Sequence, residues 1–217
     1  RRVLFRSEGL PRNDGSIGSL AGADQIYILP NAWRDAPWWS DAQIEIISAI
    51  LDSVKRRYNV DENRVVLAGV SDGATAAYYM AMRHTTPFAS FLPLNGFIRV
   101  LSNPAIDLGG GLFPHNLRNK PLFVVNGGRD RLYPIRNTEP YTKHLQQGGV
   151  EIAYHPQPEG EHNTRWWPDI KETFETFVRD HPRNPYPAAI TWEADETEVR
   201  SEEHTSELQS HHDLVCR

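Results

Sequence analysis

The chain has 217 residues, 39% of them hydrophobic and 24% charged, which is enough for one sizeable core and hardly enough for two domains. A formal net charge of −5 and the lack of any run rich in Lys and Arg argue against nucleic acid or an anionic membrane surface as a partner. No stretch approaches the roughly 18 consecutive apolar residues of a membrane-spanning helix. A single cysteine, Cys216, excludes an intrachain disulfide framework.

The two ends of the chain are related through their possible codons. Residues 200–203 (RSEE) can be encoded by AGATCGGAAGAG, and the reverse complement of that string encodes LFRS, which stands at residues 4–7. This relationship resembles translated read-through of a sequencing adapter. We therefore expect residues 1–7 and 200–217 to be artefacts outside the fold. Residues 8–199 are then part of a domain from a longer gene product, with cytoplasmic and exported locations both open.

The first predicted elements are a strand, a loop and a helix. Residues 25–30 (QIYILP) form an apolar strand, and a loop rich in Trp and Pro follows it. Ser40 with Gln43 three residues later is a capping box, which predicts the start of a helix. From Ile44 to Tyr58 apolar residues recur at helical spacing, so we expect a helix that buries one face.

Further along the chain, apolar runs and helical patterns alternate. Residues 63–70 (NRVVLAGV) are a continuous apolar run, typical of a central strand covered on both faces, and an Ala-rich helix is predicted over residues 72–82. The remaining predicted elements are strands at 90–94, 121–126 and 150–154 and helices at about 138–147 and 167–180. This alternation predicts an α/β fold in which a mostly parallel sheet carries helices on both faces.

A GxSxG pattern, Gly69-Val70-Ser71-Asp72-Gly73, joins the apolar run at 63–70 to the following helix. A strand–turn–helix setting of this kind is where a nucleophilic serine is held in a strained turn, because a Cβ at the flanking positions would collide with neighbouring backbone. The backbone N–H of Asp72 then lies at a helix N-terminus, where it can donate to an oxyanion. The alternative is a helix-capping serine between two packing glycines.

A serine hydroxyl needs a base, and the base needs an acid that orients it. Asp130 follows the predicted strand at 121–126, in the sequence NGGRDRLYP, and is our candidate acid; the alternative is a surface ion pair with Arg129 or Arg131. His162, in the loop EGEHNT, is our candidate base. His155 competes with it, but we expect His155 to lie at the end of the last strand.

GVSDGATAAYY, NGGRDRLYP and GEHN, in this order, resemble the α/β-hydrolase superfamily. Within it they are similar to the phospholipase, carboxylesterase and acyl-thioesterase group, with polyhydroxybutyrate-depolymerase-like and feruloyl esterases close by. The acid loop of that group matches Gly127, Asp130 and Pro134. The resemblance implies an α/β-hydrolase fold whose N-terminal strands are missing, with residues 8–199 as the partial domain. The His-Gly loop that supplies the group's second oxyanion donor has no counterpart between residues 8 and 25.

Aromatic residues cluster near the expected site. We predict that some of them line an acyl or aryl pocket, because rigid aromatic side chains are typical of small-molecule sites; for each residue, packing of a helix on the sheet is the alternative. The candidates for this substrate-binding role are Trp33, Trp38, Trp39, Phe97, Trp166 and Trp167.

The predicted function is that of a serine hydrolase that cleaves small-molecule carboxylic esters or thioesters through Ser71, His162 and Asp130 and an acyl-enzyme. We expect neither a cofactor nor a metal, because no His or Cys has metal-ligand spacing. The alternatives are a prolyl-oligopeptidase-like serine peptidase and a non-catalytic binding module of the same fold. We expect weak or no activity from this chain by itself, because one oxyanion donor is missing.

Overall fold

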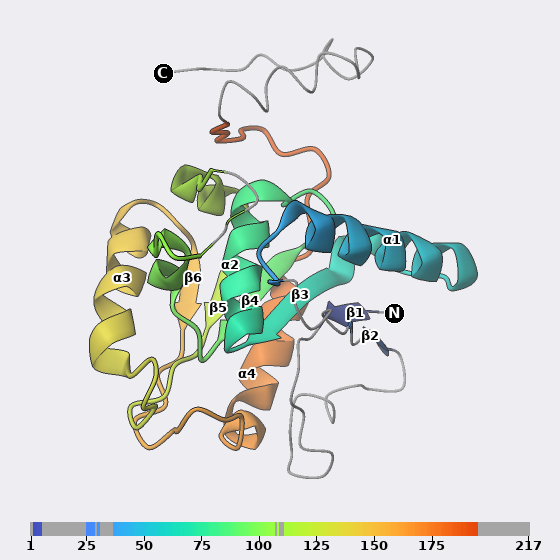
Figure 1. Cartoon of the computed structure of the whole chain (residues 1–217). Helices are drawn as coiled ribbons and strands as arrows, with labels where there is room; N and C mark the ends of the chain where they lie inside the picture. The colour runs from blue at the N-terminus through green and yellow to red at the C-terminus, as the bar shows by residue number, and fades with distance from the viewer. Residues whose placement is uncertain are drawn as a thin grey trace.

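The computed structural model describes residues 2–5, 25–28, 30, 37–106, 108 and 111–194. Its centre is a 6-stranded sheet in the order β2-β1-β3-β4-β5-β6, and all neighbouring strands run parallel (Figure 1). The strands are β1 (Arg2–Phe5), β2 (Gln25–Ile28), β3 (Val65–Val70), β4 (Ser90–Leu94), β5 (Leu122–Val124) and β6 (Ile152–Tyr154).

The strands from β2 to β6 confirm the sequence prediction, with some ends shorter by one or two residues. Strand β1 differs from it, because Arg2–Phe5 belongs to the segment that we expected to lie outside the fold. This strand lies between β2 and β3, with Phe5 beside Leu67. The codon relationship concerns the origin of the segment and carries no information on whether its apolar residues pair as a strand. The adapter origin itself stays a prediction.

Helices connect the strands, as predicted. They are α1 (Asp41–Arg57), α2 (Asp72–Arg83), α3 (Ile135–Gln147) and α4 (Trp167–Asp180), with the 3₁₀ turns η2 (Glu62–Arg64), η3 (Ile98–Ser102) and η4 (Pro114–Asn119). Helix α1 begins after Ser40 as expected, but the predicted capping box is absent: the Ser40 hydroxyl donates to the carbonyl of Pro37. In the described part of the chain, every helix falls short of the length and apolar character that crossing a membrane requires.

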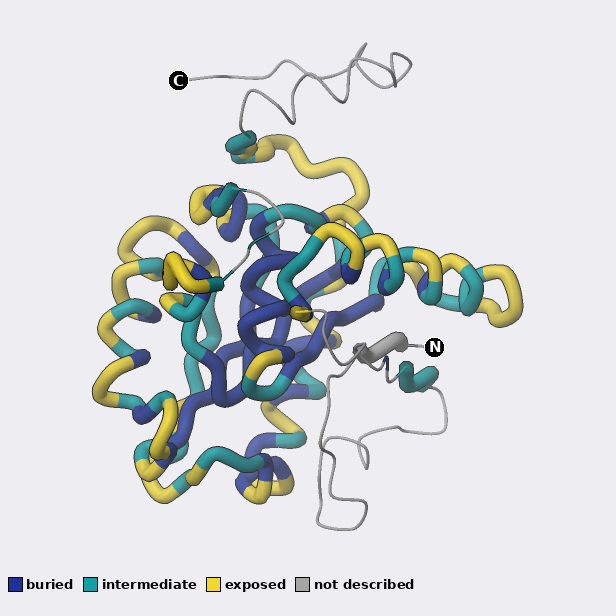
Figure 2. Tube along the Cα trace, viewed as in Figure 1, coloured by how far each residue is buried: buried dark blue, intermediate teal, exposed yellow. Residues whose placement is uncertain are grey.

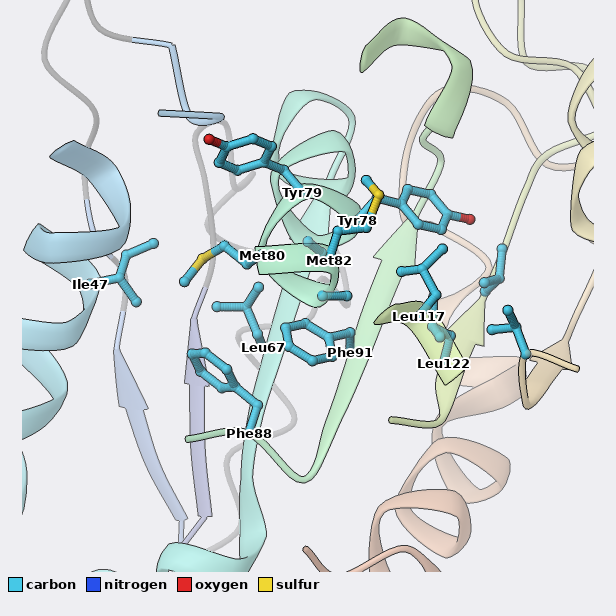
Figure 3. Packing of buried hydrophobic residues seen from close by; sticks show 14 of the residues in the cluster. Ile47, Leu67, Tyr78, Tyr79, Met80, Met82, Phe88, Phe91, Leu117 and Leu122 are labelled. Carbon is cyan, nitrogen blue, oxygen red and sulfur yellow. The ribbon is translucent and has the colours of Figure 1, made fainter. Parts of the chain in front are cut away.

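Side chains of the strands alternate between two apolar layers. Val65 and Leu67 of β3 belong to a cluster that α1, α2 and η4 cover, and Figure 3 shows Leu67 beside Met80 and Phe91 in this layer. Val66 and Ala68 point to the opposite face, where they join the buried residues of α4. The prediction of helices on both faces of the sheet is therefore confirmed.

Helix α2 is the most deeply buried helix, and its path through the molecule is dark blue in Figure 2. Every residue from Gly73 to Met82 is buried. Tyr79 and Met80 have no exposed surface, and Phe91 of β4 is equally inaccessible. Because core side chains on all sides hold this helix, the turn that precedes it has a fixed position at the edge of the sheet.

Candidate active site

Ser71 occupies the turn between β3 and α2 with a backbone that few residues other than glycine adopt. Its φ is 57° and its ψ is −117°. Such conformations cost of order 1–3 kcal/mol and persist only where the surrounding structure enforces them. Here the Ser71 N–H donates to the carbonyl of Leu94 in the neighbouring strand (3.0 Å), and the Ser71 carbonyl accepts from Ala74 (2.9 Å) and Thr75 (3.1 Å). The strained turn predicted from the GxSxG pattern is confirmed.

Asp72 begins helix α2. The first intrahelical hydrogen bonds run from the N–H groups of Ala74 and Thr75 to Ser71. The N–H groups of Asp72 and Gly73 precede these bonds and have no carbonyl one turn earlier to bind. They lie at the positive end of the helix dipole beside the Ser71 hydroxyl, where a developing negative charge is stabilised.

Asp130 lies on the loop after β5, and its side chain is fully buried. One carboxylate oxygen, Oδ1, accepts from the backbone N–H groups of Leu132 (2.8 Å) and Tyr133 (2.9 Å). The other, Oδ2, lies 2.7 Å from Nδ1 of His162. Arg129 pairs with Glu159 at the surface instead. The alternative interpretation of Asp130 as the partner of a neighbouring arginine is therefore wrong.

His162 connects the serine to the carboxylate. Its Nε2 atom lies 2.8 Å from the Oγ atom of Ser71, while Nδ1 faces Asp130. A carboxylate only accepts hydrogen bonds, so the ring proton is on Nδ1 and Nε2 is free to accept from the Ser71 hydroxyl. His162 is partly accessible, with a quarter of its side-chain surface exposed (25%), whereas Asp130 has none. This arrangement can polarise the serine O–H bond and take up its proton.

Two loops that lie far apart in the sequence support the acid and the base together. The N–H of Gly128 donates to the carbonyl of Gln157 (2.8 Å), and the N–H of Arg129 donates to that of Gly160 (2.9 Å). A Cβ on Gly128 would lie 2.2 Å from the carbonyl oxygen of Pro158. The glycines of the acid loop therefore allow the histidine loop to lie directly against it. The sequence analysis matched Gly127 to the acid loop of the resembling group but did not predict this contact with the histidine loop.

His155, the competing histidine, takes a structural position. Its ring stacks on Phe123 with the ring centroids 4.4 Å apart. Its backbone N–H donates to Val124 of the neighbouring strand. Burial lowers the pKa of His155 below its usual value, so the ring favours the neutral form. The expectation that His155 lies at the end of the last strand is confirmed.

An aromatic cluster adjoins His162. The ring of Tyr133 meets the His162 ring edge-on at 5.8 Å, and Phe97 lies between Tyr133 (6.2 Å) and Tyr141 (5.1 Å). Burial, with the nearby carboxylates of Asp72 and Asp130, raises the pKa of the Tyr133 hydroxyl. Phe97 was predicted from the sequence to line a substrate pocket. Tyr133 and Tyr141 were missed, although Tyr133 stands in the same NGGRDRLYP motif as the acid.

Among the predicted tryptophans that the structure describes, Trp39 lies in a different core layer from Trp166 and Trp167. Trp166 and Trp167 are 6% and 1% exposed and belong to the core that holds α4 on the sheet, where Trp167 packs against Phe174. Their burial favours the alternative, packing of the helix on the sheet, and a place for them in a substrate pocket stays a prediction. Trp38 is buried and Trp39 packs against the opposite core layer.

Two further predictions fall outside the described residues: Trp33, and the loop between residues 8 and 25 that was considered for a second oxyanion donor. Within the described residues, no group of three or more His, Cys, Asp or Glu side chains could hold a metal ion.

No model of a known protein family matches the sequence, and no curated protein is significantly similar to it. Solved structures do resemble it. A thermostable esterase superposes with a TM-score of 0.62 at 17% identity, over 84% of this chain and 54% of that one, so the chain spans about half the length of that esterase. A ferulic acid esterase gives a TM-score of 0.62 at 16% identity, over 82% of this chain and 83% of the other.

A third similar structure is S-formylglutathione hydrolase from Staphylococcus aureus. It superposes with a TM-score of 0.61 at 18% identity, over 82% of this chain and 80% of the other. At identities this low, the similarity to these three structures shows only that the backbones follow the same path.

Proposed function

We propose that this chain, which has the α/β-hydrolase fold, is a serine hydrolase that cleaves carboxylic esters or thioesters. The observation that carries the proposal is the position of His162, with one ring nitrogen 2.8 Å from the Ser71 hydroxyl and the other 2.7 Å from the buried Asp130 carboxylate. The strained backbone of Ser71 supports it further, because strain of this kind gathers at functional sites. The esterase and hydrolase names of the similar structures point to the same class of reaction.

In the proposed reaction, the Ser71 oxygen attacks the carbonyl carbon of the substrate while Nε2 of His162 takes the hydroxyl proton. The negative charge that develops on the carbonyl oxygen is held in part by the backbone N–H of Asp72. His162 then returns its proton to the leaving alcohol or thiol, and Ser71 remains acylated. Water, deprotonated by His162, repeats the attack and releases the acid.

Asp130 has two roles in this mechanism. Its hydrogen bond keeps the ring proton on Nδ1 of His162, so Nε2 is always the accepting atom. Its negative charge also stabilises the imidazolium that forms during proton transfer. The N–H groups of Leu132 and Tyr133 fix the carboxylate from the other side.

Phe97, together with Tyr133, is proposed to contact the substrate, because both rings lie on loops at the same edge of the sheet as Ser71. Half-buried aromatic rings offer apolar surface without the entropy cost of ordering a long side chain. We expect esters with apolar or aryl groups to be preferred over small polar ones.

Labelling with a fluorophosphonate tests the proposal, because it measures the reactivity of Ser71 without requiring complete turnover. We expect the 217-residue chain to be labelled and Ser71→Ala to remain unlabelled. The matched control is Ser48→Ala: the Ser48 hydroxyl also lies near a histidine (3.1 Å from Nε2 of His84) but donates to the carbonyl of Ile44. Equal labelling of the chain and of Ser71→Ala would refute the proposal.

Turnover, which we expect to be weak in this chain, is measured on p-nitrophenyl esters of increasing chain length. Loss of the nucleophile in such a triad lowers turnover by about 10⁶-fold, so Ser71→Ala is expected to be inactive. Hydrolysis of a peptide amide at a rate comparable to that of the ester would favour the peptidase alternative. A chain that binds esters without labelling or turnover would be the non-catalytic module.

A further inference from the structure

Asn95 directly follows β4, at the same edge of the sheet as Ser71, and has two unusual properties. It is completely buried (0% exposed), and its φ of 50° lies in the left-handed region. Asparagine is one of the few residues other than glycine that adopt this conformation. The sequence motifs do not include Asn95, and the mechanism above does not use it.

The Asn95 side chain reaches the histidine loop. Its Nδ2 amide donates to the backbone carbonyl of Asn163, the residue after His162, at 2.6 Å. The loop itself makes a tight turn, in which the N–H of Asn163 donates to the carbonyl of Glu161 (2.8 Å). The Asn95 amide is thus a buried attachment point for a loop whose histidine is partly exposed.

The backbone around Asn95 is fixed on several sides. Its N–H donates to the carbonyl of Val125 at the end of β5 (2.7 Å), and the carbonyl of the preceding Leu94 accepts from Ser71 (3.0 Å). The next residue, Gly96, passes so close to α2 that a Cβ there would lie 2.3 Å from that of Ala74. A single rigid segment therefore contacts the nucleophile turn through its backbone and the base loop through its side chain.

We propose that Asn95 is a positioning residue that holds the His162 loop at the distance from Ser71 that proton transfer requires. This inference rests on the proposed function. The left-handed backbone of Asn95 directs its amide at the Asn163 carbonyl, and the burial of Asn95 strengthens the bond because its amide is shielded from water. Displacing a base by about 1 Å can cost about 10²-fold in rate, so the bond matters for reactivity more than for substrate affinity.

The test compares two isosteric substitutions of buried asparagines. Asn95→Asp keeps the shape of the side chain and removes the N–H donor that Asn163 accepts from. The control is Asn116→Asp: Asn116 is 0% exposed, and its Nδ2 amide donates to the carbonyls of Met82 (2.8 Å) and Glu193 (2.9 Å), not to the histidine loop. Three quantities are measured: the rate constant of fluorophosphonate labelling, the fraction finally labelled and the melting temperature.

We expect Asn95→Asp to lower the labelling rate constant about 10- to 100-fold, with a complete final fraction. On esters, kcat is expected to fall by a similar factor while KM stays constant. Asn116→Asp is expected to lower the melting temperature and to label at close to the wild-type rate. Equal rate losses in the two variants, or a loss confined to the labelled fraction, would mean that Asn95 is only a packing residue.

Asn95→Gly is the second variant, because glycine adopts the left-handed backbone without strain and a folded protein is expected. It too is predicted to label slowly. Wild-type labelling rates in Asn95→Gly and Asn95→Asp, with Ser71→Ala unlabelled, would overturn this inference alone. Labelling of Ser71→Ala would overturn the proposed function instead.

Discussion

The carbonyl oxygen of Gly73 lies 1.8 Å from the position that a Cβ on Gly69 would occupy. The C-terminal end of strand β3 and the first turn of helix α2 are therefore in direct backbone contact on either side of Ser71. No side chain separates them, and the serine between them has a positive φ of 57°. The flanking-glycine explanation offered by the sequence is confirmed at Gly69.

Gly69→Ala is predicted to destabilise the protein by about 3 kcal/mol or more, because a Cβ this close to backbone forces the strand and helix apart. Gly148→Ala is the control: a Cβ there meets its nearest atom, the carbonyl oxygen of Leu145, at 3.3 Å, so we expect less than about 1 kcal/mol. Chemical denaturation measures both free energies of unfolding. Equal stabilities of the two variants would contradict the tight contact.

Asp130→Asn is predicted to lower kcat by about 10⁴-fold with little change in KM. An amide at this place can donate to Nδ1 of His162, which moves the ring proton to Nε2 and leaves no acceptor for the serine hydroxyl. Fluorophosphonate labelling should slow in parallel. Asp169→Asn, on the first turn of α4, is the control for loss of one negative charge and is expected to leave kcat unchanged.

Stability is predicted to fall as the pH drops below about 6.5, the usual pKa of histidine. Burial lowers the pKa values of His84 and His155 in the folded protein. The unfolded chain therefore binds protons at these sites at a higher pH than the folded one, and protonation favours unfolding.

His155→Phe tests this, because a phenyl ring can keep the stack on Phe123 without titrating. The variant should melt like the wild type near pH 8 and lose less stability than the wild type near pH 5.5. Thermal melts at the two pH values give the comparison. An unchanged difference between them would exclude His155 as a contributor.

Trp167→Ala and Phe97→Ala are predicted to have opposite effects. Trp167 is 1% exposed, so its removal should cost about 3–5 kcal/mol of stability and leave KM unchanged in the folded protein. Phe97 is only half-buried, so its removal should cost little stability and raise KM for aryl and long-chain esters. Denaturation and ester kinetics on both variants separate the two roles. A raised KM in Trp167→Ala would instead indicate that Trp167 contacts the substrate.

The sequence predicted those features that depend on local pattern. The apolar run of β3, the GxSxG turn and the order of Ser71, Asp130 and His162 are all visible along the chain, because each follows from its own neighbours. The structure agrees with them: the three side chains lie within hydrogen-bonding distance. The position of His155 at the end of the last predicted strand also argued correctly against His155 as the base.

What the sequence could not predict depends on contacts between distant residues. The bond from Asn95 to Asn163 joins residues far apart in the chain, and Asn95 belongs to no motif. Trp167 looks the same in sequence whether it faces a substrate or the core, and only the packing of α4 decides between them. Strand β1 was missed because codon origin was taken as a guide to structure.

The backbone hydrogen bonds between the acid loop and the histidine loop restrict how the protein can diversify. Gly128 pairs with Gln157 and Arg129 with Gly160, so an insertion in either loop would shift this register and separate the acid from its histidine. Changes in substrate preference are therefore expected to arise in other segments at this edge, such as the one that carries Phe97. Libraries of loop variants built on this scaffold should keep the lengths of these two loops constant.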